Sequence, residues 1–199
     1  YSDMNSMILE GSLVIARNPF YRFKTSSIIS KTSPRKKALN KSERDFIKEA
    51  LEVMRREESL DEKAPVHYHQ VRWIWNALML SGMRRFELAQ GMAGDLRQAD
   101  DEDGRRYWEL TIKGKGNKIA SIPVPAEFMK EFAMYREFHG LPPVPAFGPA
   151  GEPDEIPLVL PLKGPMRNVN DSLIYRAVKD LMKRASELAL AAGDPASAV

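Results

Sequence analysis

The hydrophobic pattern changes period near residue 106, and this change restricts the chain to folds that combine helices with a sheet. In "RYWELTIK", residues 106–113, apolar and polar side chains alternate, which is typical of a strand with one buried face. A second alternating run, "IASIPV", occupies residues 119–124. The intervening Gly-Lys-Gly-Asn, residues 114–117, tolerates the positive backbone angles of a tight reversal. We therefore predict an antiparallel hairpin.

A further strand precedes this hairpin. "ADDEDG", residues 99–104, is rich in turn-forming residues, so "GDLRQ", residues 94–98, is predicted to be the first strand of a small antiparallel sheet. The proline-rich run 141–165 is predicted to be a long irregular connection.

Helical spacing dominates elsewhere. Helices are predicted over residues 4–16, from Asn40 with Glu43 as a capping pair, from about His67 to Ser81, briefly from Phe86, over 126–139 and over 170–192. In the helix that begins near His67, the expected core stripe is Val71, Ile74, Trp75, Leu78 and Met79. The fold class is thus α+β and mainly α-helical, with helices around a small three-stranded antiparallel sheet.

Composition restricts the classes of protein. The 199 residues include no cysteine and no apolar run of the roughly 18 residues that span a bilayer, so we expect a soluble, cytoplasmic protein without disulfides or thiolate metal sites. Residues 1–48 carry ten Lys and Arg against four Asp and Glu. Their densest part, with Arg35, Lys36 and Lys37, is either a solvated linker or a strap along a phosphate backbone. Charge alone favours the linker.

The stretch "LSGMRRFEL", residues 80–88, places two arginines where one helix ends and another begins. An arginine at such a boundary can donate two hydrogen bonds to a phosphate, and Arg84 suits this role, with Glu87 one turn later to hold its guanidinium. The alternative is an ordinary exposed ion pair. Lys115, in the predicted hairpin turn, is either a general acid on a flexible arm or one more polar turn residue.

In order along the chain, these segments resemble the catalytic domain of the tyrosine recombinases, the family of the phage integrases and Xer-type resolvases. The first box of that family reads approximately Thr-Gly-x-Arg-x-x-Glu-Leu, and residues 81–88 fit it with Ser in place of Thr. The family's hairpin reads Gly-Lys-Gly-x-Lys followed by Val-Pro, which residues 114–118 and Ile122-Pro123 fit. The segment "VIARNPF", residues 14–20, also resembles the end of the family's core-binding domain.

The resemblance implies a domain organisation and a chemistry. Residues 1–24 would hold the last helix of a core-binding domain, 25–39 a basic linker, and 40–199 the amino-terminal part of a catalytic domain. Strand exchange on duplex DNA would proceed through a 3′-phosphotyrosine, without metal or nucleotide cofactor, in a tetramer on DNA when the protein is full length. Arg84 would clamp the phosphate, Lys115 would protonate the departing 5′-oxygen, and Glu87 would support Arg84. The expected DNA-binding residues are Arg35, Lys36, Lys37, Arg85 and Lys118.

The sequence also departs from the family pattern. The His-x-x-Arg box and the nucleophilic tyrosine of the family follow the long last helix, whereas here the last histidine is His139 and the last tyrosine is Tyr175, on the polar side of that helix. We therefore expect a fragment that at most binds DNA, cut off before the second arginine box. A non-catalytic DNA-binding protein on this scaffold stays open. So does an unrelated helical domain, in which Arg84 and Lys115 would lie far apart.

Two other groups of residues are weaker candidates. His67 and His69 are two positions apart, so they diverge on a helix, and without a third ligand we expect surface residues rather than a metal site. Trp73 points away from the predicted core stripe that contains Trp75. Trp73 could stack on a DNA base, but core or interdomain packing is the favoured interpretation.

Overall fold

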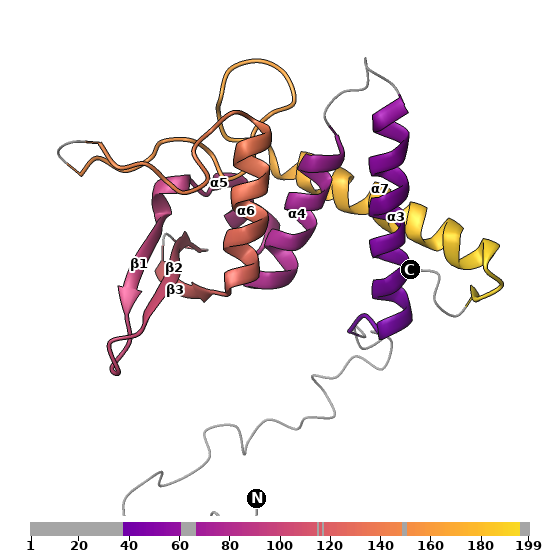
Figure 1. Ribbon diagram of the computed structural model, residues 1–199, viewed down its shortest axis with the longest axis horizontal. Coiled ribbons are helices and arrows are strands. Elements are labelled where there is room, and N and C mark those ends of the chain that lie inside the picture. Colours follow the sequence, from indigo (N-terminus) through magenta and orange to yellow (C-terminus); the bar gives the residue numbers. More distant parts are fainter. Residues whose placement is uncertain (1–37, 61–66, 115, 117, 149–150, 196–199) are drawn as a thin grey trace, which may run out of the picture. The chain divides into compact units, whose positions relative to one another are not determined.

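The structure, a computed structural model, describes residues 38–60, 67–114, 116, 118–148 and 151–195 (Figure 1). The chain divides into two units, Tyr1–Ala38 and Leu39–Val199, and all the elements named here belong to the second unit. The predicted helix at 4–16 and the basic residues Arg35, Lys36 and Lys37 lie outside the described residues. The elements are α3 (Lys41–Leu60), α4 (Tyr68–Ser81), α5 (Arg85–Gln90), the 3-10 helix η2 (Ala93–Asp95), β1 (Leu96–Asp100), β2 (Arg106–Lys113), β3 (Ile119–Val124), α6 (Ala126–Phe138) and α7 (Asp171–Ala191).

The three strands form the antiparallel sheet that the sequence predicts, in the order β1-β2-β3. Leu110 is the shared centre of the buried face, because it is opposite Leu96 on β1 and Ile122 on β3. The first strand is displaced from its predicted position: residues 94 and 95 belong to η2, and the strand continues to Asp100. The displacement has a local cause, since the Asp95 carboxylate accepts a hydrogen bond from the Met92 amide and so closes the 3-10 turn before the strand begins.

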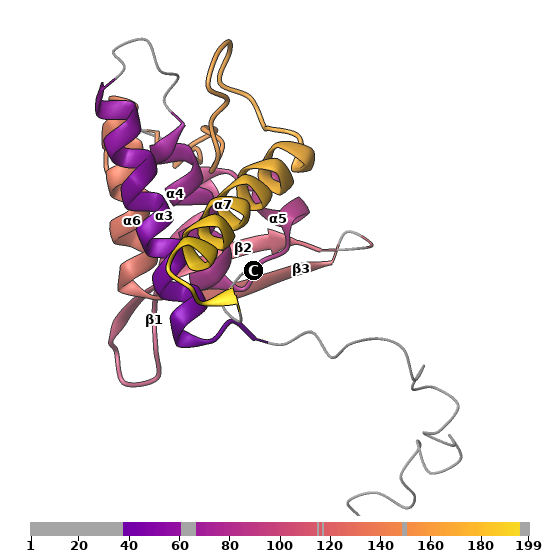
Figure 2. The same ribbon diagram turned by 90° about the vertical axis from the view of Figure 1, so that its right-hand side faces the viewer.

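Helices α3 and α7 pack against each other (Figure 2). The predicted capping pair starts α3: Asn40 Oδ1 accepts a hydrogen bond from the Glu43 amide at 2.8 Å, and the Glu43 carboxylate accepts one from the Asn40 amide. At the start of α7, Asn170 Oδ1 accepts a hydrogen bond from the Ser172 amide. The core face of α7 consists of Ile174, Ala177, Leu181, Ala185 and Ala189.

Helix α4 is buried on more than the predicted stripe. Trp73 is 1% exposed, and its Nε1 donates a hydrogen bond to the carbonyl of Leu158 at 2.6 Å. Its ring packs against Phe128, Phe132 and Tyr135 of α6, with centroid distances of 5.1, 5.2 and 5.8 Å. Trp73 is therefore a core residue and not a base-stacking platform. The prediction for Met79 was wrong, because this side chain is 48% exposed.

The predicted connection at 141–165 is irregular, as expected, but its centre is part of the core. Leu158, Val159 and Leu160 are each at most 3% exposed. Its first part pairs with the chain before β1, because Pro157 forms an antiparallel bridge with Met92 and the Leu158 amide donates to the Gly91 carbonyl at 2.9 Å. Side chains serve the next residue: Gln70 Nε2 donates to the Leu160 carbonyl at 2.6 Å, and the Leu160 amide donates to the Tyr135 hydroxyl at 3.0 Å. These bonds fix the centre of the connection against α4 and α6.

A buried ion pair anchors the same connection. Arg136 of α6 lies 2.8 Å from Asp154, and their side chains are 2% and 4% exposed. Asp154 also accepts hydrogen bonds from the amides of Ala146 and Ile156. The described unit thus has the predicted α+β architecture, and none of its described helices is long and apolar enough to cross a membrane.

Candidate active site

The two adjacent arginines lie at a change of chain direction between two helices. Gly82 ends α4 in the left-handed conformation, with φ at 68°, and its amide donates to the Leu78 carbonyl. Met83, 6% exposed, is anchored in the core, and Arg84 is extended before α5 begins at Arg85. Because Gly82 reverses the chain and Met83 fixes it, the Arg84 side chain is directed away from the core.

Arg84 is held by one buried carboxylate. Glu87 Oε1 lies 3.0 Å from the Arg84 guanidinium, and Glu87 Oε2 accepts a hydrogen bond from the Arg84 amide at 2.6 Å. The Glu87 side chain is 4% exposed, whereas that of Arg84 is 79% exposed. A buried carboxylate is costly unless it is paired, so Glu87 constrains Arg84 from the protein side. Most of the five N–H donors of Arg84 face solvent, where an oxyanion can bind.

Glu87 also lies near the start of the β2–β3 turn. A Cβ placed on Gly114 would lie 3.8 Å from Glu87 Oε1 and 3.6 Å from the Lys118 carbonyl oxygen. The Gly114 amide donates to that carbonyl at 2.7 Å, which closes the hairpin. Figure 2 shows α5 beside this hairpin. Two sequence motifs that are about 30 residues apart are therefore adjacent in space.

The predicted site residues divide between described and undescribed parts of the chain. Arg84, Glu87 and the base of the turn come together, and Lys118, at the other side of that turn, is exposed. Lys115 follows Gly114 directly but lies outside the described residues, as do Arg35, Lys36 and Lys37. Their predicted roles stay predictions.

Arg85 points to a different partner. Its guanidinium carbon lies 5.1 Å from the centroid of the Tyr175 ring, and its Nη2 lies 3.8 Å from Asp171 Oδ2. Both partners belong to α7. The Arg85 side chain is 50% exposed, so it also reaches solvent. No sequence signal identifies these partners, because they lie more than 80 residues away along the chain.

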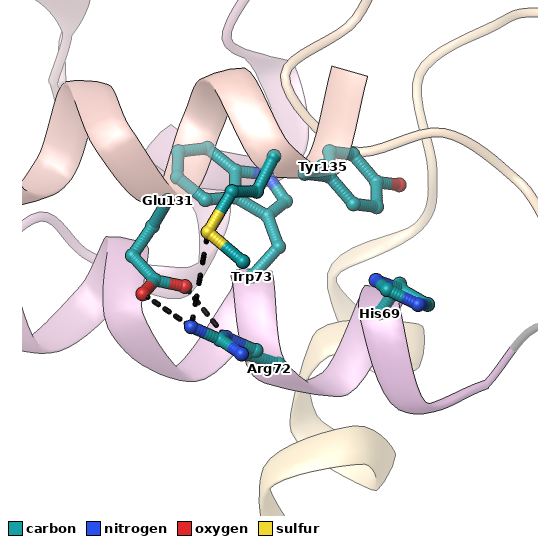
Figure 3. Close-up of a pocket in the computed structure, with 6 residues that line it drawn as sticks. His69, Arg72, Trp73, Glu131 and Tyr135 are labelled. Carbon is teal, nitrogen blue, oxygen red and sulfur yellow. Dashed lines mark hydrogen bonds and ion pairs between the residues drawn. The ribbon is translucent and has the colours of Figure 1, made fainter. Parts of the chain in front are cut away.

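A second charged pair joins α4 to α6 and has a structural role. Arg72 donates to both carboxylate oxygens of Glu131, at 2.8 and 2.7 Å (Figure 3). Burial raises the pKa of Glu131, but the hydrogen bonds and charge of Arg72 outweigh it and leave the pKa below its usual value. The cavity beside the pair, lined also by His69, Trp73 and Tyr135, has about 10 Å³, room for no more than one water molecule.

The three histidines lie on or near these helices and not in the Arg84 site. His69 stacks on Phe138 with a centroid distance of 3.8 Å, and His139 packs edge-on against Tyr135 at 4.7 Å. Burial lowers the pKa of His67, His69 and His139. Within the described ranges, no group of three or more His, Cys, Asp or Glu side chains could hold a metal ion.

This chain is similar to solved structures of a recombinase bound to DNA. No family model matches the chain, and no curated protein matches it. One similar structure is the XerH site-specific recombinase bound to palindromic difH substrate in a post-cleavage complex, with 20% identity and a TM-score of 0.46. Another is the pre-cleavage complex of XerH with difH, with 20% identity and a TM-score of 0.44. Each match covers 74% of this chain, and this chain spans 35% and 36% of those chains.

Proposed function

We propose that this chain contributes the first arginine, its supporting carboxylate and the turn lysine to the active site of a site-specific DNA recombinase. The observation that carries the proposal is the position of Glu87, which holds Arg84 and lies beside the turn that leads to Lys115. The motif order along the chain, which resembles that of the tyrosine recombinases, gives these residues their roles. The substrate is duplex DNA, and the reaction belongs to the full-length protein.

In this reaction, the oxygen of a tyrosine attacks the scissile phosphorus and the bond to the 5′-oxygen breaks. In the family that the motifs resemble, that tyrosine follows the helix that corresponds to α7. Arg84 contributes by donating hydrogen bonds to the non-bridging oxygens, whose charge increases in the transition state. Lys115 gives its proton to the departing 5′-oxygen. The phosphotyrosine conserves the bond energy, so the reverse attack by a 5′-hydroxyl rejoins DNA without an external energy source.

The proposal is tested with the full-length protein and a suicide duplex that carries a nick near the cleavage position. Loss of the short fragment beyond the nick prevents rejoining, so each cleavage leaves a covalent protein-DNA adduct that survives denaturation. We expect an adduct with the wild-type protein. A folded full-length protein that binds the duplex and gives no adduct would contradict the enzymatic function and favour a DNA-binding protein on the same scaffold.

A further inference from the structure

Arg85 connects α5 to α7 through two contacts on one face of α7. Asp171 is the first residue of α7 and Tyr175 lies one turn later, so the two side chains are neighbours on the helix surface. The Arg85 guanidinium lies over the Tyr175 ring at 5.1 Å and within 3.8 Å of the Asp171 carboxylate. A planar guanidinium is weakly hydrated and interacts well with an aromatic face, so arginine suits this position better than lysine.

The length of α5 makes such a connection important. A helix of six residues does not hold its position without tertiary contacts. Its second half is anchored, since Leu88 is 0% and Ala89 2% exposed, and Asn168 Nδ2 donates to the Ala89 carbonyl at 3.1 Å. At its beginning, Phe86 is 57% exposed and contributes little burial. Glu87 caps this end locally through its bonds with Arg84, and the contacts of Arg85 tie the same end to α7.

We infer that Arg85 is a positioning residue, which holds the first turn of α5 against α7 and thereby fixes the direction of the Arg84 guanidinium. This inference rests on the proposed function and extends it, because it assigns to Asp171 and Tyr175 a part in orienting a phosphate clamp. It also differs from the expectation that Arg85 binds DNA directly. A direct phosphate contact acts on affinity, whereas a positioning residue acts on the rate of cleavage once DNA is bound.

The test compares four variants of the full-length protein: Arg85→Ala, Tyr175→Ala, Tyr175→Phe and Arg55→Ala. Arg55 is an exposed arginine of α3 paired with Glu52, so Arg55→Ala is a matched control outside the site. Single-turnover adduct formation on the nicked duplex is measured at saturating DNA, and duplex affinity is measured separately. We expect Arg85→Ala and Tyr175→Ala to slow cleavage by about ten- to a hundredfold with affinity within about twofold of wild type. Tyr175→Phe keeps the ring under the guanidinium and is expected to retain most of the rate.

Other results overturn the inference. If Arg85→Ala weakens binding about tenfold, lowers the salt dependence by about one phosphate contact and leaves the saturated rate unchanged, Arg85 is a DNA contact and not a positioning residue. If Tyr175→Phe alone abolishes the adduct, the hydroxyl and not the ring is what matters. Unchanged rates and affinities in both alanine variants remove any role for this contact.

Failure of the proposed function is recognised separately, because wild-type protein would then form no adduct. In that case amide hydrogen exchange decides the inference without catalysis. The Leu88 amide donates to the Arg84 carbonyl at 3.0 Å and closes the first turn of α5. We expect this amide to exchange at least about tenfold faster in Arg85→Ala and Tyr175→Ala than in Arg55→Ala. Equal exchange in all three variants would show that α7 does not hold α5 through Arg85.

Discussion

Glu87 and Arg84 form an ion pair in which the carboxylate is buried and the guanidinium is exposed. The Glu87 side chain is 4% exposed and that of Arg84 is 79% exposed, and their closest atoms are 3.0 Å apart. An exposed ion pair at this spacing contributes little to stability because water competes for both ions. Here the Glu87 carboxylate is desolvated and also accepts a hydrogen bond from the Arg84 amide, so it fixes an otherwise mobile arginine.

Replacement of Arg84 is expected to separate binding from cleavage. Under the proposed function, Arg84→Ala in the full-length protein removes a hydrogen-bond donor to the transition-state oxyanion and should lower single-turnover cleavage at least about a hundredfold. Duplex affinity should change little, because a protein that binds duplex DNA typically divides its affinity over many phosphate contacts. Arg84→Lys restores the charge without the planar fork and should recover only part of the rate. Lower affinity with an unchanged rate of cleavage would contradict the role of Arg84.

Replacement of Glu87 is expected to destabilise the fold as well as slow cleavage. Glu87→Gln keeps the size of the side chain but removes the charge that pairs with Arg84, and we expect a loss of about 1–3 kcal/mol in the free energy of unfolding. Glu187→Gln is the matched control, because Glu187 is an exposed partner of Lys183. That control should change stability by less than about 0.5 kcal/mol. Urea denaturation measures the stability of both variants. Equal stabilities would contradict the role of the Glu87 carboxylate as a buried anchor for Arg84.

The buried pair Arg136–Asp154 should be among the sensitive points of the fold. Asp154→Ala leaves the Arg136 guanidinium buried without its counter-ion, and the Ala146 and Ile156 amides lose their acceptor. We expect a loss of about 3–5 kcal/mol, measured by urea denaturation. A change below about 1 kcal/mol would show that the connection at 141–165 does not depend on this pair.

Gly94 is expected to tolerate no side chain. A Cβ at this position would lie 2.6 Å from the Asp154 amide nitrogen, and backbone cannot move aside as a flexible side chain can. We therefore expect Gly94→Ala to lower the free energy of unfolding by about 1–3 kcal/mol, which corresponds to a fall of several degrees in the melting temperature. Gly114→Ala is the stability control, since its Cβ would have no neighbour closer than 3.6 Å. Equal melting temperatures for the two variants would contradict the close approach at Gly94.

The histidines make stability depend on pH. Burial lowers the pKa of His67, His69 and His139 below the usual value of 6.5, so the unfolded chain binds protons more readily than the folded protein. Their contribution to stability is complete above pH 6.5 and is lost as the pH falls below it. The raised pKa of Glu58 acts in the opposite direction. The test therefore compares wild type with His139→Phe by measuring the free energy of unfolding at about pH 7 and at about pH 5. We expect this free energy to fall less in the variant than in the wild type.

Local chemistry in the sequence predicted much of the fold. Alternation identified β2 and β3 at their observed bounds, and the pairs Asn40–Glu43 and Arg84–Glu87 follow from a three-residue helical spacing. Long-range partners could not be predicted in this way. The pair Arg72–Glu131 and the stacking of Arg85 on Tyr175 depend on how helices cross, which periodicity does not determine. The pair Arg136–Asp154 depends on the path of the irregular connection over α6, which has no sequence period. The burial of Trp73 could not be predicted for the same reason, because α6 covers a second side of α4, outside the predicted core stripe.

The most direct test of the central claim, that Arg84 and Lys115 act on one phosphate, is cleavage of a duplex whose scissile 5′-oxygen is replaced by sulfur. A thiolate departs without a proton, so the modified substrate does not need a general acid. In the full-length protein we predict that sulfur restores cleavage by Lys115→Ala to near the wild-type rate and leaves Arg84→Ala slow. If sulfur restores neither variant, or both equally, the assigned roles of these two residues are wrong.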